Sequence, residues 1–190
     1  MKQTFKRRTV LKAGLGFSLV ASQFHNIPFS NAAKIPRTHG PTTKRIIPLK
    51  TEYRPGTILI SNADRILDFV LTNNRAARYN IAIGRDGFSW TGKVDVAYKR
   101  EWPTWRPPAE MRKRDATLPK SVPPGPFNPL GARAIYLYEG GRDTLYRIHG
   151  TNDAASVGGF ETSGCFRMTN ADVLEFYENV QIGTKVVVRD

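Results

Sequence analysis

A stretch of dense proline limits what this chain can fold into. Residues 102–129 contain eight of the 13 prolines in the 190-residue sequence. Proline has no backbone N–H and its ring fixes φ, so neither a long helix nor a central strand can run through this stretch. We therefore expect a long loop, and loops of this length inside a compact domain usually serve a function. Three aromatic residues could form one wall of a groove or simply pin the loop to the core: Trp102, Trp105 and Phe127.

The segments on either side of the loop have the pattern of β-strands. From residue 56 short apolar or alternating runs are cut by turn residues, which predicts an antiparallel meander over 57–83. After the loop, RAIYLYE and TLYRIHG flank a GGRD turn and predict a hairpin. TNADVLEFYENV has helical spacing, with Thr169 or Asn170 as the cap, and TKVVVRD predicts a closing strand. The predicted fold class is mostly β, with one short helix and a long proline-rich loop.

The first 32 residues have the composition of an export signal. Basic residues precede the apolar run AGLGFSLVAS, which is too short to span a bilayer, and SNAAK then offers small side chains for cleavage. KRRTVLK resembles a twin-arginine signal at Arg7 and Arg8; an ordinary secretory signal is the alternative. We expect a signal peptide at 1–32, a linker or N-terminal arm at 33–55, and the functional domain at 56–190. The expected location is the periplasm, and the protein is not expected to be an integral membrane protein once the signal is removed.

The sequence is strongly basic, with 29 Lys and Arg against 16 Asp and Glu. Removal of residues 1–32 would take away five basic residues and no acidic ones, so the remainder stays basic. Such a charge suits nucleic acid, an anionic membrane surface or an acidic polymer. Export argues against nucleic acid and no basic amphipathic helix stands out, so an anionic cell-wall polymer is the preferred partner. A charge that only keeps the surface soluble is the other interpretation.

Cys165 is the only cysteine in the chain. Exported proteins use structural cysteines in pairs, so a lone thiol is either a small buried apolar residue or a group kept for chemistry. A thiol attacks as its thiolate, which requires a base and favours nearby positive charge. His149, at the end of a predicted strand, is the candidate base, and Arg167 supplies the charge. Gly164 allows a tight turn whose backbone N–H groups could form an oxyanion hole.

Neither a metal site nor a cofactor site is predicted. The three histidines, at positions 25, 39 and 149, are scattered and have a single cysteine among them, which is not a ligand spacing. The sequence has no phosphate loop and no dinucleotide fingerprint. We expect chemistry by protein side chains alone, in a monomer.

The residues around these candidates resemble the signature of the YkuD-type L,D-transpeptidases. That signature pairs His-Gly-Thr with Thr/Ser-x-Gly-Cys-x-Arg-Met-x-Asn-x-Asp. Here it reads HGT at 149–151 and TSGCFRMTNAD at 162–172. Supporting matches are NPLGARAIYL at 128–137, GTKVVV at 183–188 and the weaker WTGKVDV at 90–96, which has Trp90 where proline is common.

The resemblance implies a YkuD-like β-sandwich or barrel-like domain that acts on peptidoglycan. In this family a cysteine attacks the amide between a diamino acid and D-alanine in a tetrapeptide stem. D-Alanine leaves, and the acyl group passes from the thioester to an amine of a second stem or of an envelope protein. Carried onto this chain, Cys165 is the nucleophile, and His149 is first the base and then the acid.

Further roles follow from the same resemblance. The backbone N–H groups of Gly164 and Cys165 are expected to be the oxyanion donors, and Gly164 and Gly150 are expected to orient the site. Substrate contacts are expected from Arg167, Thr162 and Ser163, although a structural bond from the arginine to its own loop is an equal alternative. Many relatives have a second histidine at the position of Ser163, so His149 must act without that neighbour.

Two other functions fit the same residues. If water resolves the thioester, or if a cross-link is the donor, the chain is an L,D-carboxypeptidase or an endopeptidase. If Cys165 is only a packing residue, the chain is a non-catalytic module that binds the cell wall.

Overall fold

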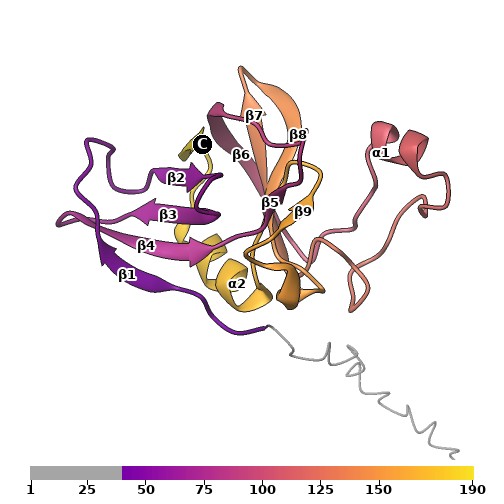
Figure 1. Ribbon diagram of the computed structural model, residues 1–190, viewed down its shortest axis with the longest axis horizontal. Helices are drawn as coiled ribbons and strands as arrows, with labels where there is room; N and C mark the ends of the chain where they lie inside the picture. The colour runs from indigo at the N-terminus through magenta and orange to yellow at the C-terminus, as the bar shows by residue number, and fades with distance from the viewer. Residues whose placement is uncertain (1–39) are drawn as a thin grey trace, which may run out of the picture. The chain divides into compact units, whose positions relative to one another are not determined.

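A computed structural model describes residues 40–190, coloured from indigo to yellow in Figure 1. The predicted export signal and the first part of the predicted arm lie outside these residues. The elements are β1 (Arg45–Pro48), β2 (Ile58–Ser61), β3 (Ile66–Val70), β4 (Arg75–Asn80), β5 (Ile83–Gly84), β6 (Gly92–Glu101), α1 (Ala109–Arg114), β7 (Arg133–Glu139), β8 (Arg142–His149), the 3-10 helix η1 (Ala154–Ser156), β9 (Phe160–Thr162), β10 (Phe166–Arg167), α2 (Asn170–Asn179) and β11 (Lys185–Arg189).

Most of the described strands form one sheet in the order β1-β4-β3-β2-β11-β6-β7-β8-β10. The predicted meander is present, because β2, β3 and β4 pair antiparallel in succession. The predicted hairpin is β7 and β8. The predicted closing strand, β11, joins the two halves, since it runs parallel to β2 and antiparallel to β6. The mostly β fold class is confirmed.

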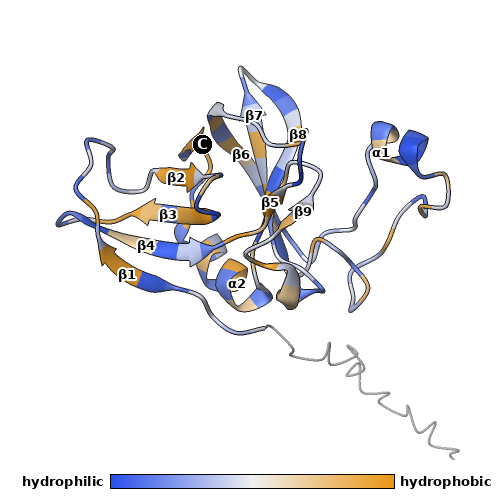
Figure 2. Cartoon of the chain, viewed as in Figure 1, coloured by the Kyte–Doolittle hydropathy of each residue, from blue (hydrophilic) through white to orange (hydrophobic). Residues whose placement is uncertain are grey.

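The core lies where the apolar faces of both halves of the sheet meet α2. Figure 2 shows hydrophobic colour along β2 and β3, and the side chains of Ile58, Ile60 and Leu67 are fully buried. From α2, Phe176 packs edge-on against Phe69 and Tyr79, with ring centroids 5.8 and 5.4 Å apart. The helix begins where predicted, because the Thr169 hydroxyl caps it by accepting a hydrogen bond from the Asp172 N–H at 3.1 Å.

An N-terminal arm at residues 40–48 is tied to this helix. The Asp172 carboxylate is buried and accepts hydrogen bonds from the hydroxyls of Thr42 and Thr43, both at 2.7 Å, and from the Thr43 N–H. The arm continues as β1, an edge strand paired antiparallel with β4. Its four residues are too few to show a periodicity, so the sequence indicated a linker or arm and no strand.

The proline-rich loop is organised around a buried amide. The side-chain N–H groups of Asn128 donate to the carbonyls of Pro103 at 2.7 Å and of Val122 and Pro123 at 3.1 Å. Trp105 and Val122 also exchange two backbone hydrogen bonds of 2.9 Å. Together these contacts close the neck of the loop. Beyond the neck the loop contains α1, a six-residue helix that stands away from the sheet in Figure 1. The sequence analysis predicted no helix in this proline-rich stretch.

Within residues 40–190, no helix combines the length and the apolar character needed to cross a bilayer.

Replacement of Asp172 by alanine is expected to lower the free energy of unfolding by about 2–4 kcal/mol, because buried hydrogen bonds to a charged group are lost and the Thr43 N–H loses its acceptor. Urea denaturation measures this change, and trypsin cleavage at Lys44 and Arg45 reports release of the arm. Asp86→Ala removes an exposed carboxylate and serves as the control. Equal unfolding free energies for the two variants would contradict the anchoring role of Asp172.

Candidate active site

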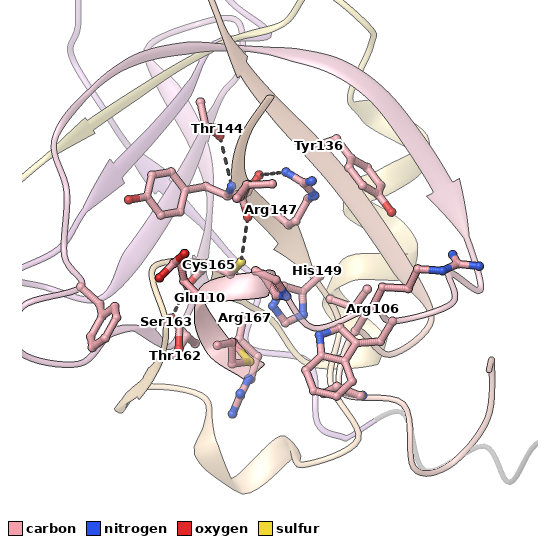
Figure 3. Close-up of a pocket in the computed structure, with 18 of the residues that line it drawn as sticks. Arg106, Glu110, Tyr136, Thr144, Arg147, His149, Thr162, Ser163, Cys165 and Arg167 are labelled. Carbon is pink, nitrogen blue, oxygen red and sulfur yellow. Dashed lines mark hydrogen bonds between the residues drawn. The ribbon is translucent and has the colours of Figure 1, made fainter. Parts of the chain in front are cut away.

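Two short neighbouring strands bring the central candidates together. β10 pairs parallel with β8, so that Phe166 lies beside Ile148 and Arg167 beside His149. Because side chains alternate across a strand, Cys165 and Arg167 face the same way as Arg147 and His149. All four side chains line one pocket of about 600 Å³, drawn in Figure 3. The pairing thus places the thiol and the imidazole at one site.

The turn before Cys165 is fixed by its neighbours. Gly164 has a φ of +104°, and a Cβ at this position would collide with the ring of Tyr146, so only glycine fits. The Thr162 hydroxyl donates to the Cys165 carbonyl at 2.7 Å and accepts the Gly164 N–H at 3.2 Å. The carbonyl of Cys165 and the N–H of Gly164 are therefore both occupied inside the turn.

The thiol is held by a distortion of β8. The register of β7 and β8 shifts between Tyr136 and Tyr138, and Leu145 in the opposing segment has a φ of +63°. Such a backbone conformation is uncommon for a bulky residue, and bulges of this kind re-aim groups beside active sites. Here the bulge turns the Leu145 carbonyl toward the sulfur, and the thiol S–H donates to it at 3.8 Å. The Leu145 side chain is 57% exposed and lines the pocket.

Burial shifts the pKa values of the thiol and the imidazole in opposite directions. Desolvation raises the pKa of Cys165 above its ordinary value, although the backbone N–H of Arg147 and the charges of Arg147 and Arg167 pull it down. Desolvation lowers the pKa of His149 to about 4, and the two arginines add to that effect. The His149 Nδ1 lies 2.5 Å from the carbonyl of Gly150, which partly opposes the shift.

The opposite wall of the pocket comes from the proline-rich loop and the segment before β6. Apolar contact surface is supplied by Phe88, Trp105, Met111 and Leu130. The Arg114 guanidinium lies 4.8 Å from the centroid of the Phe88 ring, which brings the loop against the segment before β6. Among the residues whose side chains the structure describes, the pocket is lined by four arginines and one carboxylate: Arg106, Arg114, Arg147, Arg167 and Glu110. The pocket is therefore suited to an anionic ligand.

The residues singled out from the sequence gather around this pocket. The pocket is lined by Thr162, Ser163, Cys165, His149 and Arg167. Gly164 and Gly150 are the chain neighbours of Cys165 and His149. Arg167 also donates to the Ser156 hydroxyl at 2.8 Å, which ties it to η1. Of the three aromatic residues proposed for a groove wall, Trp105 alone lines the pocket. Trp102 packs against the core and Phe127 is 83% exposed.

Several pocket residues were missed from the sequence. Arg147 could have been found, because it lies two residues before His149 and alternation puts it on the same face. Its guanidinium forms a two-point ion pair with Asp143, with distances of 2.7 and 2.8 Å. Leu145 gave no signal, since nothing in its surroundings in the sequence indicates a positive φ.

Asn170 is another residue whose role appears only in the fold. Its side chain accepts hydrogen bonds from the N–H groups of Ala132 at 2.9 Å and Thr151 at 3.2 Å, and it donates to the Thr151 carbonyl at 2.7 Å. It thereby joins the start of α2 to the segment that follows His149 at the end of β8.

Comparison with known proteins agrees with this geometry. Residues 55–188 match the YkuD family, described as the L,D-transpeptidase catalytic domain. A probable L,D-transpeptidase of Escherichia coli K12, ErfK/SrfK, is 36% identical over 150 residues, which are 75% of this chain and 46% of that protein. The chain thus spans about half the length of this curated relative.

Two solved structures extend the comparison. A Brucella melitensis protein named as a probable carnitine operon oxidoreductase is 43% identical, with a TM-score of 0.52, over 77% of this chain and 92% of that chain. An Enterococcus faecium L,D-transpeptidase has a TM-score of 0.56 at 17% identity, over 72% of this chain and 50% of that chain, and shares the fold. With the family match extending over most of its length, the chain belongs to the YkuD family of L,D-transpeptidase catalytic domains.

Proposed function

We propose that this chain is a periplasmic L,D-transpeptidase that acts on peptidoglycan stem peptides through a thioester on Cys165. The observation that supports it most is that a thiol directly before β10 and an imidazole at the end of the neighbouring strand β8 line one pocket of a YkuD domain, together with several arginines. We propose acyl transfer and not the oxidoreductase activity in the name of the Brucella melitensis protein, because the HGT and TSGCFRM segments of this chain match the acyl-transfer signature.

The charge of the pocket supports a stem peptide as the donor. Tetrapeptide stems carry free carboxylates, and one of them lies on the terminal D-alanine that leaves. Arg106 and Arg114 line the pocket from the proline-rich loop, and Arg147 and Arg167 line it from the sheet. Guanidinium groups bind carboxylates by charge-assisted hydrogen bonds. A stem that lies between the loop and the sheet would meet guanidinium groups on both sides, and Arg147 keeps Asp143 as its ion-pair partner.

The reaction begins from a neutral thiol and a neutral imidazole, because burial raises the pKa of Cys165 and lowers that of His149. The Gly150 carbonyl can only accept a hydrogen bond, so it assigns the imidazole proton to Nδ1 of His149. Nε2 therefore has the free lone pair and is the atom that takes the thiol proton. For this transfer the S–H turns away from the Leu145 carbonyl.

Acyl transfer then proceeds in two balanced steps. In the first, Sγ of Cys165 attacks the carbonyl of the diamino acid while Nε2 of His149 takes the thiol proton. The same proton passes to the D-alanine nitrogen as the amide bond breaks, which leaves a thioester and free D-alanine. In the second step an acceptor amine attacks the thioester, His149 takes the amine proton and returns it to sulfur, and a new amide is formed.

The acceptor decides between the related activities. An amine of a second stem gives a cross-link, an amine of an envelope protein gives an anchored protein, and water gives L,D-carboxypeptidase activity. The masses of the products distinguish the three. A wall-binding module would bind sacculi and release no D-alanine. The periplasmic location follows from the basic, apolar and small-residue order of residues 1–32, with Arg7 and Arg8 favouring the twin-arginine route.

The variant Cys165→Ser is expected to lose D-alanine release from tetrapeptide muropeptides by at least about 1,000-fold, because a hydroxyl is a far weaker nucleophile beside a base of such low pKa. Mass spectrometry of the wild type caught early in turnover should show an acyl group at residue 165. Circular dichroism checks that the variant is folded. D-Alanine release by the serine variant at the wild-type rate would contradict the thioester mechanism.

The alkylation rate of Cys165 by iodoacetamide is expected to rise about tenfold for each pH unit between pH 6 and 8, since the thiolate alone reacts and the raised pKa lies above this range. Cys165 is the only cysteine, so the mass of the intact protein measures the rate directly. A thiolate–imidazolium pair would react at a constant rate over the same range. A flat profile would therefore disprove the neutral starting state.

A further inference from the structure

The indole of Trp90 contacts the residue that precedes the nucleophile. Its Nε1–H donates to the carbonyl oxygen of Gly164 at 3.0 Å. Trp90 lies just before β6, far from Cys165 in the sequence, and it is not among the residues that line the pocket. The contact therefore reaches the turn from outside the substrate site.

The indole ring is held firmly in this place. It stacks on Tyr146 with a centroid distance of 4.5 Å and an interplanar angle of 10°, and it lies 5.5 Å from the ring of Phe166. The backbone of Trp90 is also fixed, because its carbonyl accepts a hydrogen bond from the buried side chain of Asn62 at 2.9 Å. Asn62 in turn donates its own N–H to the Arg189 carbonyl at 2.8 Å. The N–H of the indole is thus a donor whose direction is set by packing.

The hydrogen bond fixes the orientation of one peptide group. In a trans peptide the C=O and the N–H point in opposite directions. The carbonyl of Gly164 points at Trp90, so the N–H of Cys165 points away from Trp90. Among residues 40–190 this N–H has no hydrogen-bond acceptor, whereas the Gly164 N–H and the Cys165 carbonyl are both taken by Thr162. One backbone donor next to the sulfur is left for the substrate.

We propose that Trp90 is a positioning residue that aims the Cys165 N–H at the oxyanion formed during acylation of Cys165. This inference rests on the proposed acyl-enzyme chemistry and extends it to a residue outside the pocket. An oxyanion donor is effective when its direction is fixed before the reaction, because no energy is then spent on reorienting it.

Two reagents that modify Cys165 separate this role from a general structural one. p-Nitrophenyl acetate acylates the thiol through a tetrahedral oxyanion: the sulfur gains the acetyl group, nitrophenolate leaves, and His149 takes the thiol proton. Iodoacetamide alkylates the same sulfur by direct displacement of iodide and forms no oxyanion. A change in the aim of the Cys165 N–H therefore affects the first reaction and spares the second.

The variant Trp90→Phe keeps an aromatic ring on Tyr146 and removes the indole N–H. We expect its acylation rate to fall about 10- to 100-fold, below the loss seen when an oxyanion donor is removed entirely. Its alkylation rate should stay within about twofold of the wild type. Trp102→Phe is the matched control, because Trp102 is also half-buried against the core, whereas the indole that donates to the Gly164 carbonyl is that of Trp90. The control substitution should change both rates equally or change neither.

An equal fall in both rates for Trp90→Phe, or no fall in either, would overturn the proposal. If Trp90→Phe does not fold, 3-benzothienylalanine at position 90 keeps the size of the bicyclic ring and removes only the N–H, and the same two rates decide. D-Alanine release from a tetrapeptide muropeptide by the wild type is measured in parallel. Absence of that release, together with a selective loss of acylation in the variant, would refute the proposed peptidoglycan activity and leave the role of Trp90 standing.

Discussion

The site depends on the parallel pairing of β10 with β8. Cys165 and His149 are separated by a glycine-rich segment, and a strand pair of two residues brings them to one face of the sheet. The pairing is secured on both sides of β10. The Met168 N–H donates to the His149 carbonyl at 2.8 Å, while Arg167 and Ala82 exchange backbone hydrogen bonds of 2.9 and 2.8 Å. The segment that carries Cys165 is thus held by backbone hydrogen bonds to two neighbouring segments.

The partial removal of Cys165 and His149 from water changes their pKa values and the reactivity of the thiol. Desolvation raises the pKa of the Cys165 thiol and lowers the pKa of the His149 imidazole, so it favours the neutral form of each group. Oxidants and alkylating agents attack the thiolate, so a protonated thiol is a poor target for them. The arginines and the backbone N–H of Arg147 favour the thiolate, and they act at close range when the proton is withdrawn.

The sequence allowed the parts of this structure that rest on local patterns to be predicted. Strand alternation indicated the meander and the hairpin, and helical spacing with a threonine cap indicated α2. The motif around Cys165 and His149 led to residues that do line one pocket. What could not be predicted depends on contacts distant in the chain. The left-handed backbone of Leu145 follows from a bulge, the strand character of residues 45–48 follows from pairing with β4, and the bond from Trp90 to Gly164 exists only after folding.

The buried side-chain amide of Asn128 holds the proline-rich loop through hydrogen bonds that lie within the loop. Its bonds to Pro103, Val122 and Pro123 close the neck, while the turn before Cys165 is held separately by Thr162 and Trp90. The two systems share no hydrogen bond among these groups. Substitutions at the tip of the loop can therefore change the lining of the pocket while the hydrogen bonds that hold the turn before Cys165 stay in place.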